Sequence, residues 1–357
     1  YGQLTGNEFV EQAVYQEWKN SSFPGMNISC QTCHVPRIDD PVKISTMPPW
    51  LDPRTPFGMH HLAGANVFML KILKNNSVEL GLTASSVLMD STISRATRML
   101  QDRSLAITLS EEERTEDTIF VNLKLNNLAG HKFPSGYPSR RVFVSLLVKN
   151  ETGDTLFYSG KMDGDYQLIQ EDMPFEMHHD LINDEGQVQL YEMVMGDVNG
   201  DLTTVLLRAD HQLKDNRLPP AGFTEQHNSY DTVPIIGTAQ NDPDFNKING
   251  NQGSGSDIIH YHIPSLGNTG SLSIIASVYY QTVSSSWLAE TFSQTSTEID
   301  RFRTYYEQAD LMPVLVAEEE ILSTAIGIRD IEVGNSLFVF PNPATDHITI
   351  RYRLPAG

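Results

Sequence analysis

Apolar residues recur at helical spacing in three segments of the first hundred residues. The first segment opens with a capping-box spacing from Thr5 to Glu8 and predicts a helix that ends near Asn20. After a proline-rich loop, two more helices are predicted over 65–74 and 84–101. The inward face of the last helix is predicted to consist of Leu88, Ile93, Ala96 and Leu100.

From about Thr118 the apolar period changes to two, which is typical of half-buried strands. The segments 142–148 and 155–159 flank a turn-forming stretch, so they predict a hairpin. Further predicted strands cover 188–194, 203–208, 258–263 and 272–282, with a helix at 298–308 and a last strand pair from about 336. The succession predicts an α+β protein with a helical region over 1–110 and an antiparallel β-sandwich over 111–325.

Composition and charge narrow the classes of function. With 357 residues, the chain is long enough for roughly two domains with cores. Its longest apolar runs are strand-sized, whereas a membrane-spanning helix needs about 20 apolar residues. The net charge of −20 argues against nucleic acid and anionic membranes and suits a basic protein partner. The chain starts at Tyr1 without a leader, so we expect that a signal peptide was removed or that upstream sequence is missing.

The two cysteines of the chain form a single motif. Cys30 and Cys33 are three residues apart, and His34 follows directly. This spacing allows both sulfurs to bond the two vinyl groups of one porphyrin while the imidazole binds its iron, so the motif predicts covalent haem c. The alternatives are a disulfide redox motif in a thioredoxin-like unit and a zinc site completed by His60 and His61.

A six-coordinate iron needs a second axial ligand. His60 and His61 follow the proline-rich loop and open a helical segment, so we predict that one of them binds the iron. Methionine ligation would raise the reduction potential and is the alternative. The methionines near the motif are Met26, Met47 and Met59, and the further histidine candidates are His131, His178 and His179.

Two other groups of residues offer binding chemistry. Arg140 and Arg141, close to Lys132, are predicted to neutralise haem propionates, with a solvated strand edge as the alternative. The segment 197–201 resembles a fragment of a calcium loop but lacks the distal glutamate. An Asx-rich turn explains it better than calcium. No nucleophile motif and no phosphate-binding glycine loop stands out.

Several segments resemble the family of secreted multihaem c-type cytochromes, over about residues 1–317. They are 11–18, the motif at 30–34, His60-His61-Leu62-Ala63-Gly64-Ala65-Asn66, Gly130-His131-Lys132-Phe133-Pro134-Ser135-Gly136 with its continuation to 141, and 213–223. The resemblance implies that His60 is an axial ligand, although Leu62 replaces the usual aromatic residue. It also implies that His131 lies against a haem. Family members carry several haem motifs, and this chain has one, so the spare histidines imply haems on upstream sequence or on neighbouring subunits.

The tail from 340 to 355 is similar to the C-terminal sorting domain of the type IX secretion system of Bacteroidetes and relatives. Those domains are small β-sandwiches that direct export through the outer membrane. The resemblance implies a secreted or cell-surface protein whose sorting domain, at 336–357, is truncated.

Together these features predict an extracellular electron-transfer cytochrome with one bis-histidine haem. Its expected partners are redox proteins or neighbouring haem subunits, in a homo-oligomer, a filament or another multihaem conduit. One alternative is a haem oxidoreductase acting on nitrite, hydroxylamine or peroxide, so whether the chain is an enzyme stays open. Another is a surface adhesion module with a structural haem.

Overall fold

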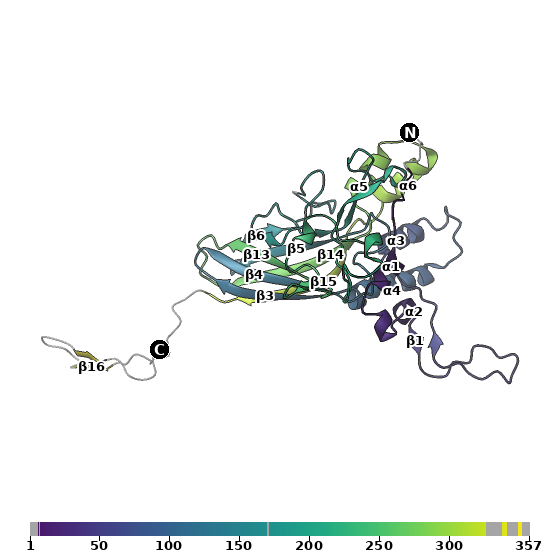
Figure 1. The fold of residues 1–357 in the computed structure, drawn as a ribbon, viewed down its shortest axis with the longest axis horizontal. Coiled ribbons are helices and arrows are strands. Elements are labelled where there is room, and N and C mark those ends of the chain that lie inside the picture. The colour runs from purple at the N-terminus through teal and green to yellow at the C-terminus, as the bar shows by residue number, and fades with distance from the viewer. Residues whose placement is uncertain (1–5, 7, 170, 326–337, 341–348, 352–357) are drawn as a thin grey trace.

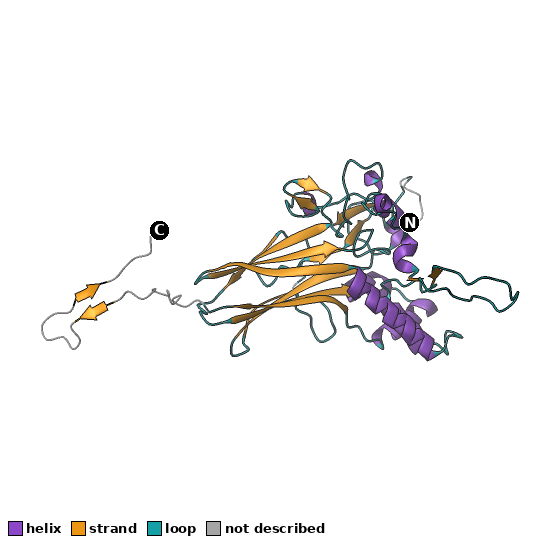
Figure 2. Ribbon diagram, turned by 90° about the horizontal axis from the view of Figure 1, so that it is seen from below, coloured by secondary structure: helices purple, strands orange, loops and turns teal. Residues whose placement is uncertain are grey.

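The computed structural model describes residues 6, 8–169, 171–325, 338–340 and 349–351. Helices and strands are both abundant, so the class is broadly α+β, as predicted. Figures 1 and 2 show two layers of long strands with helices gathered at one end, and the segment between β1 and β2 extending away from the body.

Most of the helices lie before the first long strand or between the last two. The α-helices are α1 (Val14–Lys19), α2 (Cys30–His34), α3 (Val67–Asn75), α4 (Ser86–Arg103), α5 (Ser285–Phe292) and α6 (Thr297–Glu307). Short 3₁₀ turns are η1 (Pro24–Met26), η2 (Leu206–Arg208), η3 (Tyr230–Thr232) and η4 (Thr238–Gln240).

Two sheets form the body. The first has the order β3-β4-β13-β7, and the second has the order β15-β14-β5-β6 with β8 paired to β5. The strands of the first sheet are β3 (Leu105–Arg114), β4 (Thr118–Asn127), β13 (Ser256–Pro264) and β7 (Leu181–Ile182). Those of the second are β15 (Val314–Ser323), β14 (Leu272–Gln281), β5 (Arg141–Asn150), β6 (Thr155–Ser159) and β8 (Leu190–Tyr191).

The remaining strands form small antiparallel pairs. They are β1 (Arg37–Ile38) with β2 (Phe57–Gly58), β9 (Met193–Gly196) with β10 (His211–Asp215), β11 (Lys247–Ile248) with β12 (Asn251–Gln252), and β16 (Phe338–Phe340) with β17 (Thr349–Arg351).

The core lies between the two large sheets. In β4 every second side chain is buried, so Val121, Leu123 and Leu125 point to one face. They belong to the same cluster as Val144 of β5 and Ile274 of β14, which joins both sheets and the inner faces of the helices. Each such side chain stabilises the fold by about 1.5–3 kcal/mol through burial.

The helices differ from the prediction at their ends. The first one begins at Val14, far inside the predicted range, and the predicted capping residue Thr5 lies outside the described residues. On α4, Ala96 and Leu100 are buried as predicted, but the prediction was wrong for Leu88, which is 61% exposed in the first turn. The reason is that only the C-terminal part of α4 reaches the core.

The strands confirm the predicted hairpin of β5 and β6 and the predicted strands β13 and β14. The predicted strand 203–208 was wrong: this segment contains η2, and β9 pairs instead with β10. The structure adds β3, β15 and α5, and it pairs β7 with β13 in parallel. Because β3 begins at Leu105, the first sheet starts inside the predicted helical region.

The predicted last strand pair corresponds to β16 and β17. The remainder of the predicted sorting segment, including Ser336, lies outside the described residues. Among the helices that the structure describes, none is both long and apolar enough to cross a membrane.

Candidate functional site

The cysteine motif forms the single-turn helix α2. The helix begins there because Ser29 and Thr32 cap it reciprocally, side chain to backbone. The thiols of Cys30 and Cys33 are free, and Cys30 is exposed. The loop before α2 is attached to α1 because the Trp18 indole N–H donates to the Ile28 carbonyl over 3.0 Å.

Both cysteines and His34 face a cavity of about 520 Å³. Its walls also include His131, and they are mostly apolar side chains from separate parts of the chain. The large apolar side chains of the walls are Tyr15, Trp18, Phe23, Met99, Phe133 and Tyr280. Phe133 and Tyr280 stack with ring centroids 6.3 Å apart, so the rear wall joins the loop before β5 to strand β14.

His34 and His131 both line this cavity, and their rings lie close to each other. Their centroids are 6.5 Å apart, and their planes differ by 14°. His34 uses Nδ1 to bond the Ala63 carbonyl over 2.7 Å, and His131 uses Nδ1 to bond the Lys132 carbonyl over 3.0 Å. A carbonyl only accepts, so each Nδ1 carries the proton and each Nε2 keeps a lone pair for a metal. Burial lowers the pKa of His131, which favours the neutral ring.

The backbone around His131 is held from both sides. The Asn127 side-chain amide donates to the carbonyls of His131 and Leu218, both over 2.8 Å. Phe133 and Leu218 exchange backbone hydrogen bonds of 2.9 and 2.8 Å. The Lys132 N–H donates to the Glu17 carboxylate over 3.0 Å. These contacts fix the position of the ring that faces His34.

Four buried charged side chains lie directly behind this loop. We call Glu17, Lys132, Asp215 and Arg217 the charged quartet; their side chains are 0–6% exposed. Arg217 bonds Asp215 through two nitrogens at 2.8 Å and approaches Glu17 at 3.1 Å, while Lys132 bonds Asp215 at 2.7 Å. Burial alone would raise the pKa of Asp215, but Arg217 and Lys132 lower it overall, so its carboxylate stays charged. Two positive and two negative charges balance.

The two predicted arginines have different surroundings. Arg140 lines the cavity and donates to the Ser135 carbonyl over 2.6 Å. Its guanidinium packs over Gly136, where a φ of +90° favours glycine. Arg141 is outside the cavity walls: it bonds Gln281 over 2.7 Å and Glu171 over 2.9 Å. Of the two predicted arginines, only Arg140 therefore lines this cavity.

His60 and His61 are not among the residues that line the cavity, and His60 is exposed. The next residue of the cavity wall after them in the sequence is Gly64, and the Ala63 carbonyl bonds His34. The prediction that His60 is the second ligand therefore stays a prediction, while the structure brings His34 and His131 together. The methionines considered as alternatives, Met26, Met47 and Met59, are likewise absent from the cavity wall.

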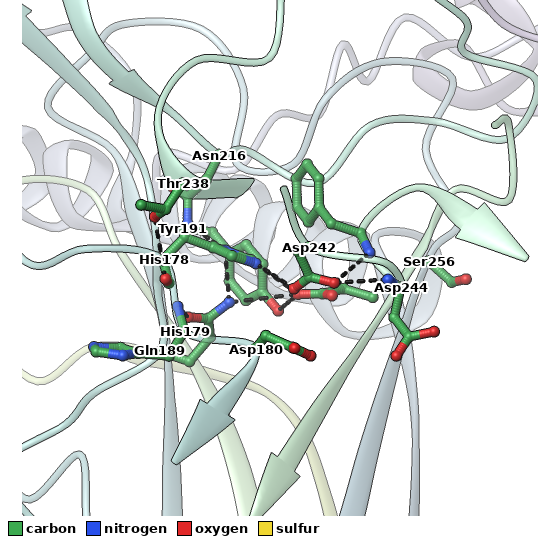
Figure 3. A network of polar contacts seen from close by, with 12 residues as sticks. His178, His179, Asp180, Gln189, Tyr191, Asn216, Thr238, Asp242, Asp244 and Ser256 are labelled. Atoms are coloured by element: carbon green, nitrogen blue, oxygen red, sulfur yellow. Dashed lines mark hydrogen bonds and ion pairs between the residues drawn. The ribbon is translucent and has the colours of Figure 1, made fainter. Parts of the chain in front are cut away.

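His178 belongs to a separate buried polar cluster (Figure 3). Its Nδ1 receives amide N–H bonds from Gln189 and Asn216, over 2.9 and 3.0 Å. Those amides are oriented by backbone groups, since the Gln189 and Asn216 oxygens accept from the N–H groups of 179 and 192. The proton of His178 is therefore on Nε2, which donates to Asp242 over 2.9 Å, and His178 does not line the haem-motif cavity.

The neighbours of His178 also form hydrogen bonds with other side chains. His179 bonds Glu176 over 2.5 Å. Burial raises the pKa of Asp257, on the inner face of β13, to about 6. Tyr191 donates to Asp257 over 2.6 Å.

The calcium-like segment forms a turn. The Asp197 carboxylate accepts the backbone N–H groups of Asn199 and Asp201, over 2.8 and 3.1 Å. These bonds are those of an Asx turn, so nothing in this segment supports a calcium site.

Sequence reasoning missed the residues that hold the site from a distance. The sequence pattern assigns no role at this site to Glu17 or Tyr280. The local sequence does not mark Glu17 as buried, because its carboxylate is paired with Arg217, 200 residues further along the chain. No local signal exists for Tyr280, whose role depends on the pairing of β14 with β5.

Comparisons with known proteins give little further constraint. No protein-family model matches the chain, and no curated protein is significantly similar in sequence. A penta-haem cytochrome c552 from Thermochromatium tepidum matches in structure with a TM-score of 0.46 and 18% identity, over 87% of this chain and 51% of that one. The chain thus spans about half the length of that cytochrome.

Proposed function

We propose that this chain binds one covalent haem c and serves as an electron-transfer protein, with His34 and His131 as the two axial ligands. The observation that carries the proposal is the pair of nearly parallel imidazoles, 6.5 Å apart, that line the same cavity as both cysteines. The choice of His131 replaces our sequence-based preference for His60.

The residues fit the group in size and chemistry. A cavity of about 520 Å³ falls in the range of roughly 300–1,000 Å³ that is usual for cofactor and ligand pockets. Its apolar and aromatic walls suit a macrocycle. Arg140 and Arg103 are the cations in its wall, and either guanidinium can pair with a propionate.

The distance between the two rings also fits. Metal–imidazole bonds are about 2 Å long, and a ring nitrogen lies roughly 1 Å from its ring centre, which places the centroids of two opposed ligands about 6 Å apart. The observed separation is 6.5 Å.

The chain's own residues have distinct tasks in this proposal. The sulfurs of Cys30 and Cys33 hold the cofactor covalently, and the Ala63 and Lys132 carbonyls keep the protons of His34 and His131 on Nδ1. Phe133 and Tyr280 exclude water from the rear wall. The cofactor, when bound, supplies a one-electron couple at its iron. With both axial positions taken by histidine, substrate chemistry at the metal is disfavoured, so we favour an electron carrier over an oxidoreductase.

The test is optical spectroscopy of the ligand variants. His131→Ala should convert a six-coordinate low-spin spectrum to a high-spin one that binds carbon monoxide or cyanide quickly. The matched control, His60→Ala, should leave the spectrum of the unsubstituted protein unchanged. If the His60 variant loses the low-spin spectrum and the His131 variant keeps it, the ligand assignment is wrong. If acidified organic solvent extracts the pigment from the denatured protein, the covalent attachment is wrong as well.

Location and assembly belong to the same proposal. We infer a secreted or cell-surface protein from the haem motif and from the resemblance of the tail to a sorting domain. Exposed histidines such as His60 support contacts with further haems in an oligomer, a filament or a multihaem conduit. Cell fractionation tests the first inference. The mass of the purified particle at high concentration tests the second, since a monomeric, single-haem particle contradicts it.

A further inference from the structure

A second constellation of metal-binding side chains lies on the outer face of the first sheet, apart from the haem cavity. His260 is on β13, Asp180 directly precedes β7, and Asp244 is in the loop before β11. One ligand atom from each lies within 4.8 Å of the others. All three side chains are partly exposed, between 31% and 42%, so a cation from solvent can reach them.

The imidazole is held in the state that binds metals. The Nδ1 atom of His260 lies 2.7 Å from the side-chain oxygen of Asn122, its register partner on β4. An amide oxygen only accepts, so Nδ1 carries the proton and Nε2 faces the two carboxylates. A histidine that ligates a metal through one nitrogen usually donates from the other in this way.

The two carboxylates lack sufficient cationic partners. Among the described residues, the ion pairs of Asp180 and Asp244 are with His260 alone, at 3.9 and 3.0 Å from Nε2. The Oδ1 atom of Asp180 is buried and has no hydrogen-bond partner, which is costly for a carboxylate oxygen. The Asp242 carboxylate accepts the backbone N–H of Asp244 over 2.7 Å, so a third negative charge lies nearby (Figure 3). One imidazolium cannot neutralise this group.

We propose that His260 Nε2, Asp244 Oδ2 and Asp180 Oδ1 bind a divalent first-row transition metal ion such as Zn²⁺. Ligand atoms bonded at about 2 Å lie roughly 2.8–3.3 Å apart in octahedral or tetrahedral sites. The 3.0 Å between His260 Nε2 and Asp244 Oδ2 fits this range, and Asp180 Oδ1, at 3.9 Å from Nε2, would move closer on binding. The imidazole disfavours Mg²⁺ and Ca²⁺, which take oxygen ligands. Water completes the coordination on the exposed side.

Binding would cross-link three segments that are separate in the sequence. The Asp180 carbonyl already accepts the His260 N–H over 2.9 Å, so the metal would reinforce the short parallel pairing of β7 with β13. The metal therefore stabilises one edge of the first sheet. This site is independent of the haem proposal and stands or falls separately.

The experiment measures zinc uptake by the haem-loaded protein. After treatment with EDTA, the protein is dialysed against buffered Zn²⁺, and bound zinc is counted by elemental analysis. The unsubstituted chain should bind one more zinc ion than His260→Gln, and Asp180→Asn should bind it at least tenfold more weakly. His262→Gln is the matched control, because His262 is the next outward-facing residue on β13 and contacts the Phe120 ring edge to face instead.

A milder variant protects the test against loss of folding. Asn122→Ala removes only the acceptor behind the imidazole and should weaken zinc binding by about 10- to 100-fold. The Soret band should be the same in all variants. Equal zinc uptake by the unsubstituted chain, His260→Gln and Asp180→Asn overturns the proposal, as does the absence of zinc from the unsubstituted chain; His260 is then an imidazolium paired with Asp244.

Discussion

Replacing Lys132 by Met tests whether the charged quartet behind the loop of His131 is a buried, mutually dependent set. Lys132 is fully buried, and its ammonium bonds Asp215 over 2.7 Å and the Pro234 carbonyl over 2.8 Å. Methionine has a similar length and fits the space, but it leaves two carboxylates, Glu17 and Asp215, with one cation, Arg217. The variant therefore buries one uncompensated negative charge and one carbonyl without a donor.

The uncompensated charge sets the expected loss of unfolding free energy. Breaking a buried ion pair by removing one partner costs about 3–5 kcal/mol of unfolding free energy. Lys71→Met is the matched control, because Lys71 also pairs with an aspartate, at 2.9 Å, but the two side chains are 34% and 56% exposed. An exposed pair contributes about 0.2–1 kcal/mol. The two variants should thus differ by several kcal/mol although both remove one Lys–Asp pair.

Urea titration followed by far-ultraviolet circular dichroism measures both values on the haem-loaded protein. The double variant Lys132→Met/Asp215→Asn leaves Glu17 and Arg217 as a neutral pair, so its loss should be smaller than the sum of the two single losses. A loss below about 1 kcal/mol for Lys132→Met, equal to that of the control, would refute the claim that the quartet is a buried and mutually dependent set.

Three further changes have defined outcomes. Gly130→Ala places a Cβ 3.0 Å from the Phe23 ring, so it should lower the unfolding free energy by about 1–3 kcal/mol and reduce the ratio of Soret to protein absorbance. Burial raises the pKa of Asp257 from its ordinary value of 3.8 to about 6, so the folded protein loses stability relative to the unfolded chain as the pH rises from about 4 to 6. Asp257→Asn keeps an acceptor for Tyr191 and avoids this loss. Across that window, the unfolding free energy of the variant, measured by urea midpoints at several pH values, should rise by on the order of 2–3 kcal/mol relative to that of the unsubstituted protein. Arg140→Met removes a positive charge beside the proposed haem and should lower the midpoint potential by on the order of 40 mV, equivalent to about 1 kcal/mol, in a redox titration.

Local patterns in the sequence predict the regular elements that are amphipathic by themselves. The alternation in β4 and the turn between β5 and β6 are local properties, and both are confirmed. Strands β3 and β15 escape prediction because each carries three consecutive glutamates, which interrupt the alternation. Their pairing with the central strands overrides the local pattern.

Prediction of the site shows the same division. The motif at 30–34 can be recognised from the sequence because its two cysteines and its histidine lie within five consecutive residues. The choice between His60 and His131 depends on which loop packs near α2, and nearness in sequence to the motif does not determine that packing. Asn127, Glu17 and Leu218 position the loop of His131 through contacts between distant segments, and no local pattern encodes them. The constellation around His260 is assembled in the same way from three separate segments.

The rear wall of the cavity has a consequence for how the protein is made. Cys30 and Tyr280, which line the same cavity, are 250 residues apart in the sequence. Closing the cavity therefore depends on contacts of large sequence separation. During synthesis the attachment motif emerges long before the strand that closes the space behind it. A chain that terminates before β14 would keep both thiols and both facing imidazoles in its sequence, yet the pocket for the macrocycle would stay open to water on one side.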